Sequence, residues 1–261
     1  MTAKVVVVGG GNMGAALARG LVSSGWDPGS LAVAEPDSAR RASLIELLPG
    51  VQIHESPVAA DGAVVAVKPG DAEPACRAVA AAHISRVLSV MAGVRIASLE
   101  SWVGATVVVR AMPNTPALLG AGAAAISGGT RAEEADLSWA EEILGSVGTT
   151  VRVPEASLDA VTGLSGSGPA YLFYVAEALI EAGSALGLPE EVSRSLVLQT
   201  FRGSALMLAE AGEAPEVLRA RVTSPGGTTE AGIGVLAEAG VAPAFERAVT
   251  AAARRSAELG G

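Results

Sequence analysis

The stretch Lys4-Val-Val-Val-Val-Gly-Gly-Gly-Asn-Met-Gly14 decides the fold of this chain. Its four consecutive valines predict a buried strand, because β-branched side chains suit a pleated surface that is covered on both faces. From position 13 onward apolar residues return at the spacing of a helix. Gly9, Gly11 and Gly14 therefore form a G-x-G-x-x-G pattern between a strand and a helix.

Each of these three glycines has a physical role in such a turn. The first permits the tight turn, the second lets the backbone approach a pyrophosphate, and the third lets the helix pack closely on the strand. The free N–H groups and the positive dipole end of the helix then hold the phosphate charge. We predict dinucleotide contacts from Gly9, Gly11, Asn12, Met13 and Gly14. The alternative is a glycine-rich turn that binds no ligand.

The composition limits the class of protein. The 261 residues are enough for two modest domains or one large one. Mean hydropathy is high at +0.44, but the longest uncharged run, residues 111–130, contains prolines and glycines and predicts no membrane span. The N-terminus lacks the features of a signal peptide, and we expect a cytoplasmic protein.

Charge and side-chain chemistry exclude several partners. The net charge of −9 argues against nucleic acid and anionic membranes, so an anionic ligand must be held by backbone dipoles or a few arginines. Cys76 is the only cysteine, and His54 and His83 are the only histidines. None has the spacing of metal ligands, so we predict no metal site, and we interpret Cys76 as a buried, inert thiol.

Strands and helices alternate through the first half of the chain. Strands are predicted at 31–34, 51–53, 63–67, 86–91 and 105–110, with helices at 37–48, 71–82 and 95–101 between them. This alternation is typical of a Rossmann-type, doubly wound parallel sheet. A strand at 121–126, a helix at 131–146 and a strand at 149–153 complete a predicted dinucleotide-binding domain, residues 1–154.

Polar residues stand where these strands end, at the edge where such sheets bind ligands. Glu35 follows the second strand, where it would bind a ribose diol and repel a 2′-phosphate. Ser38, Arg40 and Arg41 come next and would instead hold that phosphate. A third interpretation is a solvated turn that starts a helix, so these residues leave the choice between NADH and NADPH open.

Two further segments are predicted to face the nicotinamide. Val67, Lys68 and Pro69 end another strand at the same edge, where Lys68 either contacts the cofactor or is a charge in water. Asn114 is bracketed by two prolines within residues 113–116, which fix the backbone and present its side chain.

The second half of the chain shows no clear strands. Helices are predicted near 170–186, 189–210, 214–220, 230–239 and 243–258. The first of them carries apolar groups on every face, with Glu177 and Glu181 as its only charges. Such a helix must be buried on all sides. We therefore predict an all-α domain, residues 155–261, that intertwines with a second subunit.

Five collinear blocks, at 9–14, 66–69, 110–116, 159–171 and 224–229, together resemble pyrroline-5-carboxylate reductases. The resemblance implies a Rossmann domain followed by a helical dimerisation domain, in a homodimer that often assembles further into a decamer of five dimers. It implies the last step of proline biosynthesis, reduction of Δ1-pyrroline-5-carboxylate to L-proline with NADPH or NADH. The family often has a small polar residue at the position of Glu35, so the carboxylate here predicts better use of NADH.

The same resemblance implies the substrate site. Thr229 matches the hydroxyl that bonds the ring nitrogen of the imine while hydride reaches the C=N carbon; the alternative is that Thr229 only caps a helix. The substrate carboxylate is expected in a nest of backbone N–H groups before a helix, formed by Ser224, Gly226, Gly227, Thr228 and Thr229.

Two other functions compete with this one. β-Hydroxyacid dehydrogenases and ketopantoate-type reductases need a lysine in the second domain, and this chain has none after Lys68. A non-catalytic dinucleotide sensor is disfavoured by the intact blocks at 159–171 and 224–229.

Overall fold

A computed structural model describes residues 3–260 of the chain, which divide into two compact units. Unit 1 runs to Ser167 and also takes in the chain from Thr250 onward. Unit 2 spans Gly168–Val249. The division of the chain by function at residues 154 and 155 stays a prediction.

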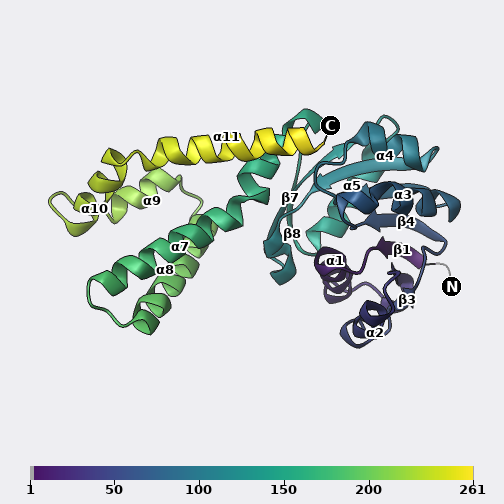
Figure 1. Cartoon of the computed structure of the whole chain (residues 1–261), viewed down its shortest axis with the longest axis horizontal. Coiled ribbons are helices and arrows are strands. Elements are labelled where there is room, and N and C mark those ends of the chain that lie inside the picture. Colours follow the sequence, from purple (N-terminus) through teal and green to yellow (C-terminus); the bar gives the residue numbers. More distant parts are fainter. Residues whose placement is uncertain (1–2, 261) are drawn as a thin grey trace. The chain divides into compact units, whose positions relative to one another are not determined.

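Unit 1 is built on an eight-stranded sheet in the order β3-β2-β1-β4-β5-β6-β7-β8. Figure 1 shows strands of this sheet surrounded by the helices of unit 1. The strands are β1 Ala3–Val8, β2 Leu31–Ala34, β3 Gln52–His54, β4 Ala60–Val65, β5 Arg86–Ser89, β6 Val107–Met112, β7 Gly122–Gly128 and β8 Gly148–Arg152. Neighbouring strands are parallel except for β6 and β7, which are antiparallel. Residues 113–121 connect that pair, and they are too few for the crossover that a parallel pair requires.

Helices cover both faces of this sheet. They are α1 Asn12–Ser23, α2 Ser38–Leu47, α3 Ala72–Ala81, α4 Ile96–Val103 and α5 Glu134–Gly145. Val5 and Val7 of β1 belong to the core beneath α1 and α5, whereas Val6 and Val8 belong to the core beneath α3 and α4. All four valines are buried, with the alternation of a strand. The predicted doubly wound architecture is confirmed, with the antiparallel pairing of β7 as its one irregularity.

The end of β4 differs from the sequence-based prediction of a strand over 63–67. The strand ends at Val65, although the Ala66 N–H still donates to the Val8 carbonyl at 2.8 Å. Lys68 then begins a short 3₁₀ turn, Pro69–Asp71, because proline cannot continue the ladder. Lys68 therefore stands in the loop beyond the strand.

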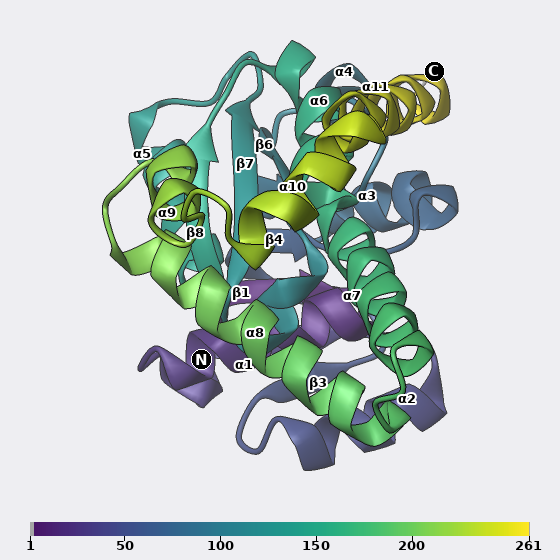
Figure 2. The same ribbon diagram turned by 90° about the vertical axis from the view of Figure 1, so that its left-hand side faces the viewer.

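A short helix, α6 Leu158–Val161, and a π-helical turn, Thr162–Gly166, lead to the helices of unit 2. Those helices are α7 Gly168–Ala185, α8 Glu190–Glu210, α9 Pro215–Arg221, α10 Thr228–Glu238 and the first half of α11 Val241–Leu259. Helices α7 and α8 contact each other. Figure 2 shows that they come together near the loop that joins them and diverge away from it.

Unit 2 has almost no interior in the single chain. Of residues 168–249, all of which are described, only Ser193 is buried. The side chains of Phe173 and Tyr174 on α7 are 64% and 73% exposed. Apolar surface of this extent on a helical pair marks an interface with another chain, which is what the apolar faces of α7 predict from sequence.

Within residues 3–260, no helix combines the length and the apolar character needed to cross a membrane.

Candidate active site

The glycine turn joins β1 to α1 as its sequence predicts. Gly9 has φ +100, and a Cβ there would lie 2.8 Å from the Ala66 carbonyl oxygen. A Cβ on Gly14 would lie 1.9 Å from the carbonyl oxygen of Gly9. Both positions therefore exclude any side chain, the first by its conformation and the second by close packing.

Gly11 has the opposite surroundings. A Cβ there would meet no atom within 4 Å, so the backbone is open. Gly11 is also the N-cap residue of α1, and no side chain caps that helix end. The first N–H groups of α1 are thus left for a ligand, and the dipole of the helix favours a negative charge there.

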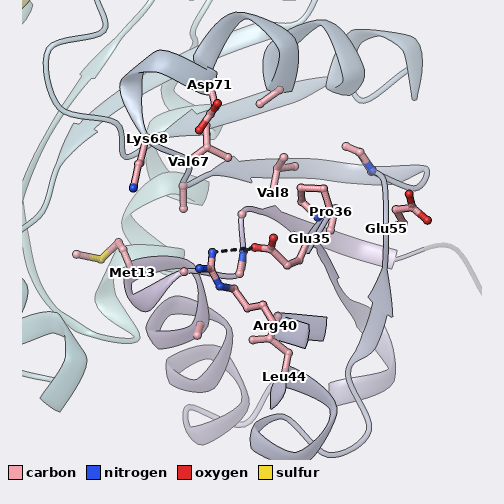
Figure 3. Close-up of a pocket in the computed structure, with 18 of the residues that line it drawn as sticks. Val8, Met13, Glu35, Pro36, Arg40, Leu44, Glu55, Val67, Lys68 and Asp71 are labelled. Atoms are coloured by element: carbon pink, nitrogen blue, oxygen red, sulfur yellow. Dashed lines mark hydrogen bonds and ion pairs between the residues drawn. The ribbon is translucent and has the colours of Figure 1, made fainter. Parts of the chain in front are cut away.

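A cavity of about 930 Å³ opens above this turn (Figure 3). Its walls come from the glycine turn, the end of β2, helix α2, the loop after β3, the loop after β4 and helix α3. Its size is in the range of cofactor sites. Among the predicted cofactor contacts, those that line it are Gly9, Gly11, Asn12, Met13, Glu35, Arg40, Val67 and Lys68. Those that lie outside its lining are Gly14, Ser38, Pro69 and Asn114.

Glu35 lies inside the wall of the cavity and is only 3% exposed. Its Oε2 accepts from the Gly10 N–H at 2.9 Å and its Oε1 from the Asp37 N–H at 3.0 Å. Arg40 Nη1 is 3.6 Å from Oε2 (Figure 3). The carboxylate therefore ties the glycine turn to the end of β2, and each oxygen keeps a lone pair for a further donor.

Some of the other polar residues after β2 hold the loop in place, and one faces the cavity. Arg41 donates to the carbonyl oxygens of Glu35 and Pro36, so its charge supports the loop. Asp37 caps α2 by accepting from the backbone N–H of Arg40. The Arg40 side chain is 55% exposed, so it is the cation that can reach a ligand at this end.

Lys68 and Met13 stand together on the left of the cavity in Figure 3, with Glu35 near the middle and Glu55 on the right. Among the described residues, none pairs with the Lys68 ammonium group. A cationic group is therefore available at the end of the cavity away from Glu55.

Asn114 has both of its amide atoms engaged. Nδ2 donates to the Ser165 carbonyl at 3.1 Å, and Oδ1 accepts from the Ala123 N–H at 2.9 Å. A nicotinamide contact by Asn114 stays a prediction, but the geometry shows that its amide links β7 to the carbonyl of Ser165.

The predicted substrate loop lies in unit 2. Gly226 has φ +71, and Gly227 is the N-cap residue of α10 with no side chain capping the helix. Thr228 and Thr229 are the first helical residues, so Thr229 is not the cap that the alternative interpretation required. The Gly226 N–H donates to the Glu230 carboxylate at 2.7 Å, which shows that this loop can hold a carboxylate.

Sequence reasoning missed several residues of the cavity wall. Gly10, Leu44, Glu55 and Ser56 line it. A Cβ on Gly10 would lie 2.3 Å from Leu44 Cδ1, so this glycine is also required by packing. The polar pair that follows the third strand was the available signal for Glu55 and Ser56, because the same edge of the sheet carries Glu35.

The thiol of Cys76 does not line the cavity. Cys76 is buried in α3, and burial raises the pKa of its thiol to about 11. Within residues 3–260, no three His, Cys, Asp or Glu side chains gather as metal ligands would.

Two family models match parts of this chain. Residues 155–259 match the family model described as pyrroline-5-carboxylate reductase dimerisation, and residues 4–93 match one described as NADP oxidoreductase, coenzyme F420-dependent. The pyrroline-5-carboxylate reductase of Corynebacterium melassecola is 40% identical over 98% of each chain. The Synechocystis protein of the same name is also 40% identical and covers 100% of this chain and 99% of its own.

Solved structures agree with these relatives. A pyrroline-5-carboxylate reductase from Coxiella burnetii superposes with a TM-score of 0.94 at 36% identity, covering 100% of both chains. The Plasmodium falciparum pyrroline carboxylate reductase with NADP bound gives 0.85 at 30% identity, covering 99% of this chain and 98% of that one. The fold and the family that the sequence predicted are both confirmed: this chain belongs to the pyrroline-5-carboxylate reductase family.

Proposed function

We propose that this chain reduces Δ1-pyrroline-5-carboxylate to L-proline with NAD(P)H, and that the cavity of unit 1 holds the cofactor. The observation that carries the proposal is the open backbone of Gly11 at an uncapped helix end beneath a cavity of about 930 Å³. The chain is an NAD(P)H-dependent oxidoreductase of proline biosynthesis by its family.

The residues of the cavity fit a dinucleotide. The N–H groups of Gly11, Asn12 and Met13 would hold the pyrophosphate at the start of α1, with Gly9 and Gly14 shaping the turn. Glu35, Arg40 and Ser38 would meet the adenosine ribose, and Val67, Lys68 and Pro69 the nicotinamide side. The bound nicotinamide supplies the hydride.

Both cofactors, NADPH and NADH, suit this site, and we propose better use of NADH than is usual in the family. The carboxylate of Glu35 retains lone pairs that a 2′-hydroxyl can reach, and it repels a 2′-phosphate. Arg40, which would attract that phosphate, is paired with Glu35.

The loop Ser224–Thr229 would hold the substrate carboxylate. Thr228 and Thr229 offer backbone N–H groups at the N-terminus of α10, where the dipole favours an anion despite a net charge of −9. The Gly227 N–H donates to the Ser224 carbonyl at 3.0 Å and the Gly226 N–H to the Glu230 carboxylate, so each would exchange that acceptor for the substrate. Each hydrogen bond to the carboxylate contributes about 1.5–3 kcal/mol. The Glu230 carboxylate already accepts from Gly226, so the donor geometry suits this group.

Thr229 would act on the reacting ring. Its hydroxyl would donate a hydrogen bond to the ring nitrogen, which orients the imine and favours its reduction at the C=N carbon. A protonated imine is electrophilic without a strong acid catalyst, which suits a chain whose two histidines, His54 and His83, both lie outside the lining of the cavity.

The chain forms a homo-oligomer through its dimerisation domain. We propose a homodimer that buries the apolar faces of α7 and α8, with a decamer of five dimers as the larger assembly. The functional domains would be residues 1–154 and 155–261. A cytoplasmic location without nucleic-acid or membrane partners fits the net charge of −9.

The test is a direct assay of the purified chain. Δ1-Pyrroline-5-carboxylate is mixed with NADPH or with NADH, the loss of reduced-cofactor absorbance is followed, and proline is identified by chromatography. We expect imine-dependent oxidation with both cofactors. If neither cofactor is oxidised, the assignment is wrong. Turnover of a β-hydroxyacid or ketopantoate but not of the imine would favour the competing reductases.

A further inference from the structure

The chain passes from unit 1 to unit 2 through the π-helical turn Thr162–Gly166. The Ser167 N–H donates to the Thr162 carbonyl at 2.8 Å, which is the wide spacing of a π turn. Such turns are rare and are frequently found at functional sites. Helix α7 begins immediately after it, at Gly168.

At the start of α7, the carbonyl of Ser165 lacks a backbone N–H donor. In an α-helix the Ser165 carbonyl would accept from the backbone N–H of residue 169. Residue 169 is proline and has no N–H to donate. The Nδ2 of Asn114 donates to the Ser165 carbonyl instead, at 3.1 Å. A side chain from another part of unit 1 thus replaces the missing backbone donor.

Asn114 is itself fixed from its other side. Its Oδ1 accepts from the Ala123 N–H of β7 at 2.9 Å, and its backbone carbonyl accepts from the Ala117 N–H at 3.2 Å. Pro113 and Pro116 restrict the backbone on either side. The amide therefore joins a strand of the sheet to the turn from which α7 begins.

This bridge is separate from the dinucleotide cavity. None of the residues that line the cavity belongs to β6, to β7 or to the π-helical turn. A change at Asn114 consequently leaves the walls of that cavity in place.

We infer that Asn114 is a positioning residue for imine reduction: it supplies the donor that Pro169 lacks and so fixes the start of α7. The inference rests on the proposed function, because its kinetic effect is on turnover of the imine. The affinity for the cofactor is set by the residues of the cavity and does not depend on Asn114.

The first test is a pair of substitutions in a double-mutant cycle. We expect Asn114→Ala to lower kcat/KM for the imine at least tenfold, with the dissociation constant of NADPH, measured by fluorescence titration, within twofold of wild type. Pro169→Ala restores a backbone N–H at residue 169. In that background we expect the same Asn114→Ala change to cost less than twofold, because Ser165 now has a donor within the helix.

The matched control is Thr115→Ala, the neighbouring exposed polar side chain, which we expect to leave both measurements unchanged. A fivefold or larger rise in the NADPH dissociation constant of Asn114→Ala would mean direct contact with the cofactor and overturn the inference. Wild-type kinetics in Asn114→Ala, or an undiminished loss in the Pro169→Ala background, would overturn it as well.

Two measurements keep the inference testable in other circumstances. If Asn114→Ala does not fold, Asn114→Asp takes its place. One carboxylate oxygen still accepts from the Ala123 N–H, but the other faces the Ser165 carbonyl oxygen and cannot donate to it. We therefore expect the same loss of kcat/KM for the imine. If the wild-type chain reduces no imine, the proposed function fails. Amide hydrogen exchange of residues 162–172 still decides the positioning role. We expect Asn114→Ala to accelerate this exchange and the further change Pro169→Ala to slow it again. Exchange that Asn114→Ala leaves unchanged would refute that role.

Discussion

Replacing Glu35 is expected to shift cofactor preference toward NADPH. Its carboxylate accepts from the Gly10 N–H and the Asp37 N–H, and Arg40 lies 3.6 Å from it. Glu35→Gln removes the charge but keeps an oxygen for Gly10. Glu35→Ser removes both, which leaves the buried Gly10 N–H without its acceptor at a cost of about 1–3 kcal/mol in stability.

The magnitude follows from the geometry of Arg40. At 3.6 Å in a largely aqueous medium, its attraction to Glu35 is about 1 kcal/mol, since its side chain is 55% exposed. Without that competition, a charge-assisted hydrogen bond from Arg40 to a 2′-phosphate contributes about 1.5–3 kcal/mol. We therefore expect the ratio of kcat/KM for NADPH to that for NADH to rise roughly 10- to 150-fold.

The assay measures kcat/KM for both cofactors at saturating imine in wild type and in both variants. Glu55→Gln is the matched control, because it removes another carboxylate that lines the cavity, and we expect the ratio to stay within twofold. Adding Arg40→Ala to Glu35→Gln should abolish the gain. An unchanged ratio in both Glu35 variants, with their folding verified by circular dichroism, would refute the reasoning.

Three further outcomes follow from the structure. Thr229→Ala is expected to lower kcat/KM for the imine about tenfold or more with an unchanged melting temperature, whereas Thr229→Ser retains the hydroxyl and most of the activity; a wild-type rate in the alanine variant removes this residue from the mechanism. Glu230→Gln is expected to lower KM for pyrroline-5-carboxylate several-fold, because the substrate carboxylate no longer competes with a charged group for the Gly226 N–H. An equal decrease of KM for 1-pyrroline, which has no carboxylate, would contradict that explanation. Cys76 is expected to resist alkylation in the native protein up to about pH 10, because its pKa of about 11 keeps the buried thiol protonated below that value, and rapid labelling at pH 8 without denaturant would show that the site is open.

The sequence predicted the sheet well because its signals are local. Side-chain shape alone explains why four valines in a row form a strand whose residues alternate between two cores. The space around the backbone alone explains why the turn needs Gly9 and Gly14. The antiparallel pairing of β7 has no such signal in residues 122–128 themselves. It follows from the shortness of the connection after β6, which becomes informative only when both strand ends are known.

The candidate site was predictable to the extent that its residues follow strand ends. Glu35 and Lys68 were predicted in this way, and both line the cavity, although their contacts with a cofactor stay predictions. Asn114 was predicted beside the nicotinamide on a different ground, because two bracketing prolines fix its backbone and present its side chain. Whether both amide atoms have partners depends on Ala123 and Ser165, which are brought to Asn114 by a strand pairing and a π-helical turn that no local pattern specifies.

The helical unit shows why composition can predict an interface that a single chain does not contain. A helix in water is stabilised mainly by burying one face. Helix α7 has apolar residues on all faces, yet α8 covers only part of it, and Phe173 and Tyr174 remain 64% and 73% exposed. Burying such side chains contributes about 1.5–3 kcal/mol each. The energy that stabilises unit 2 must therefore come largely from a second subunit, so for this half of the chain assembly is part of folding.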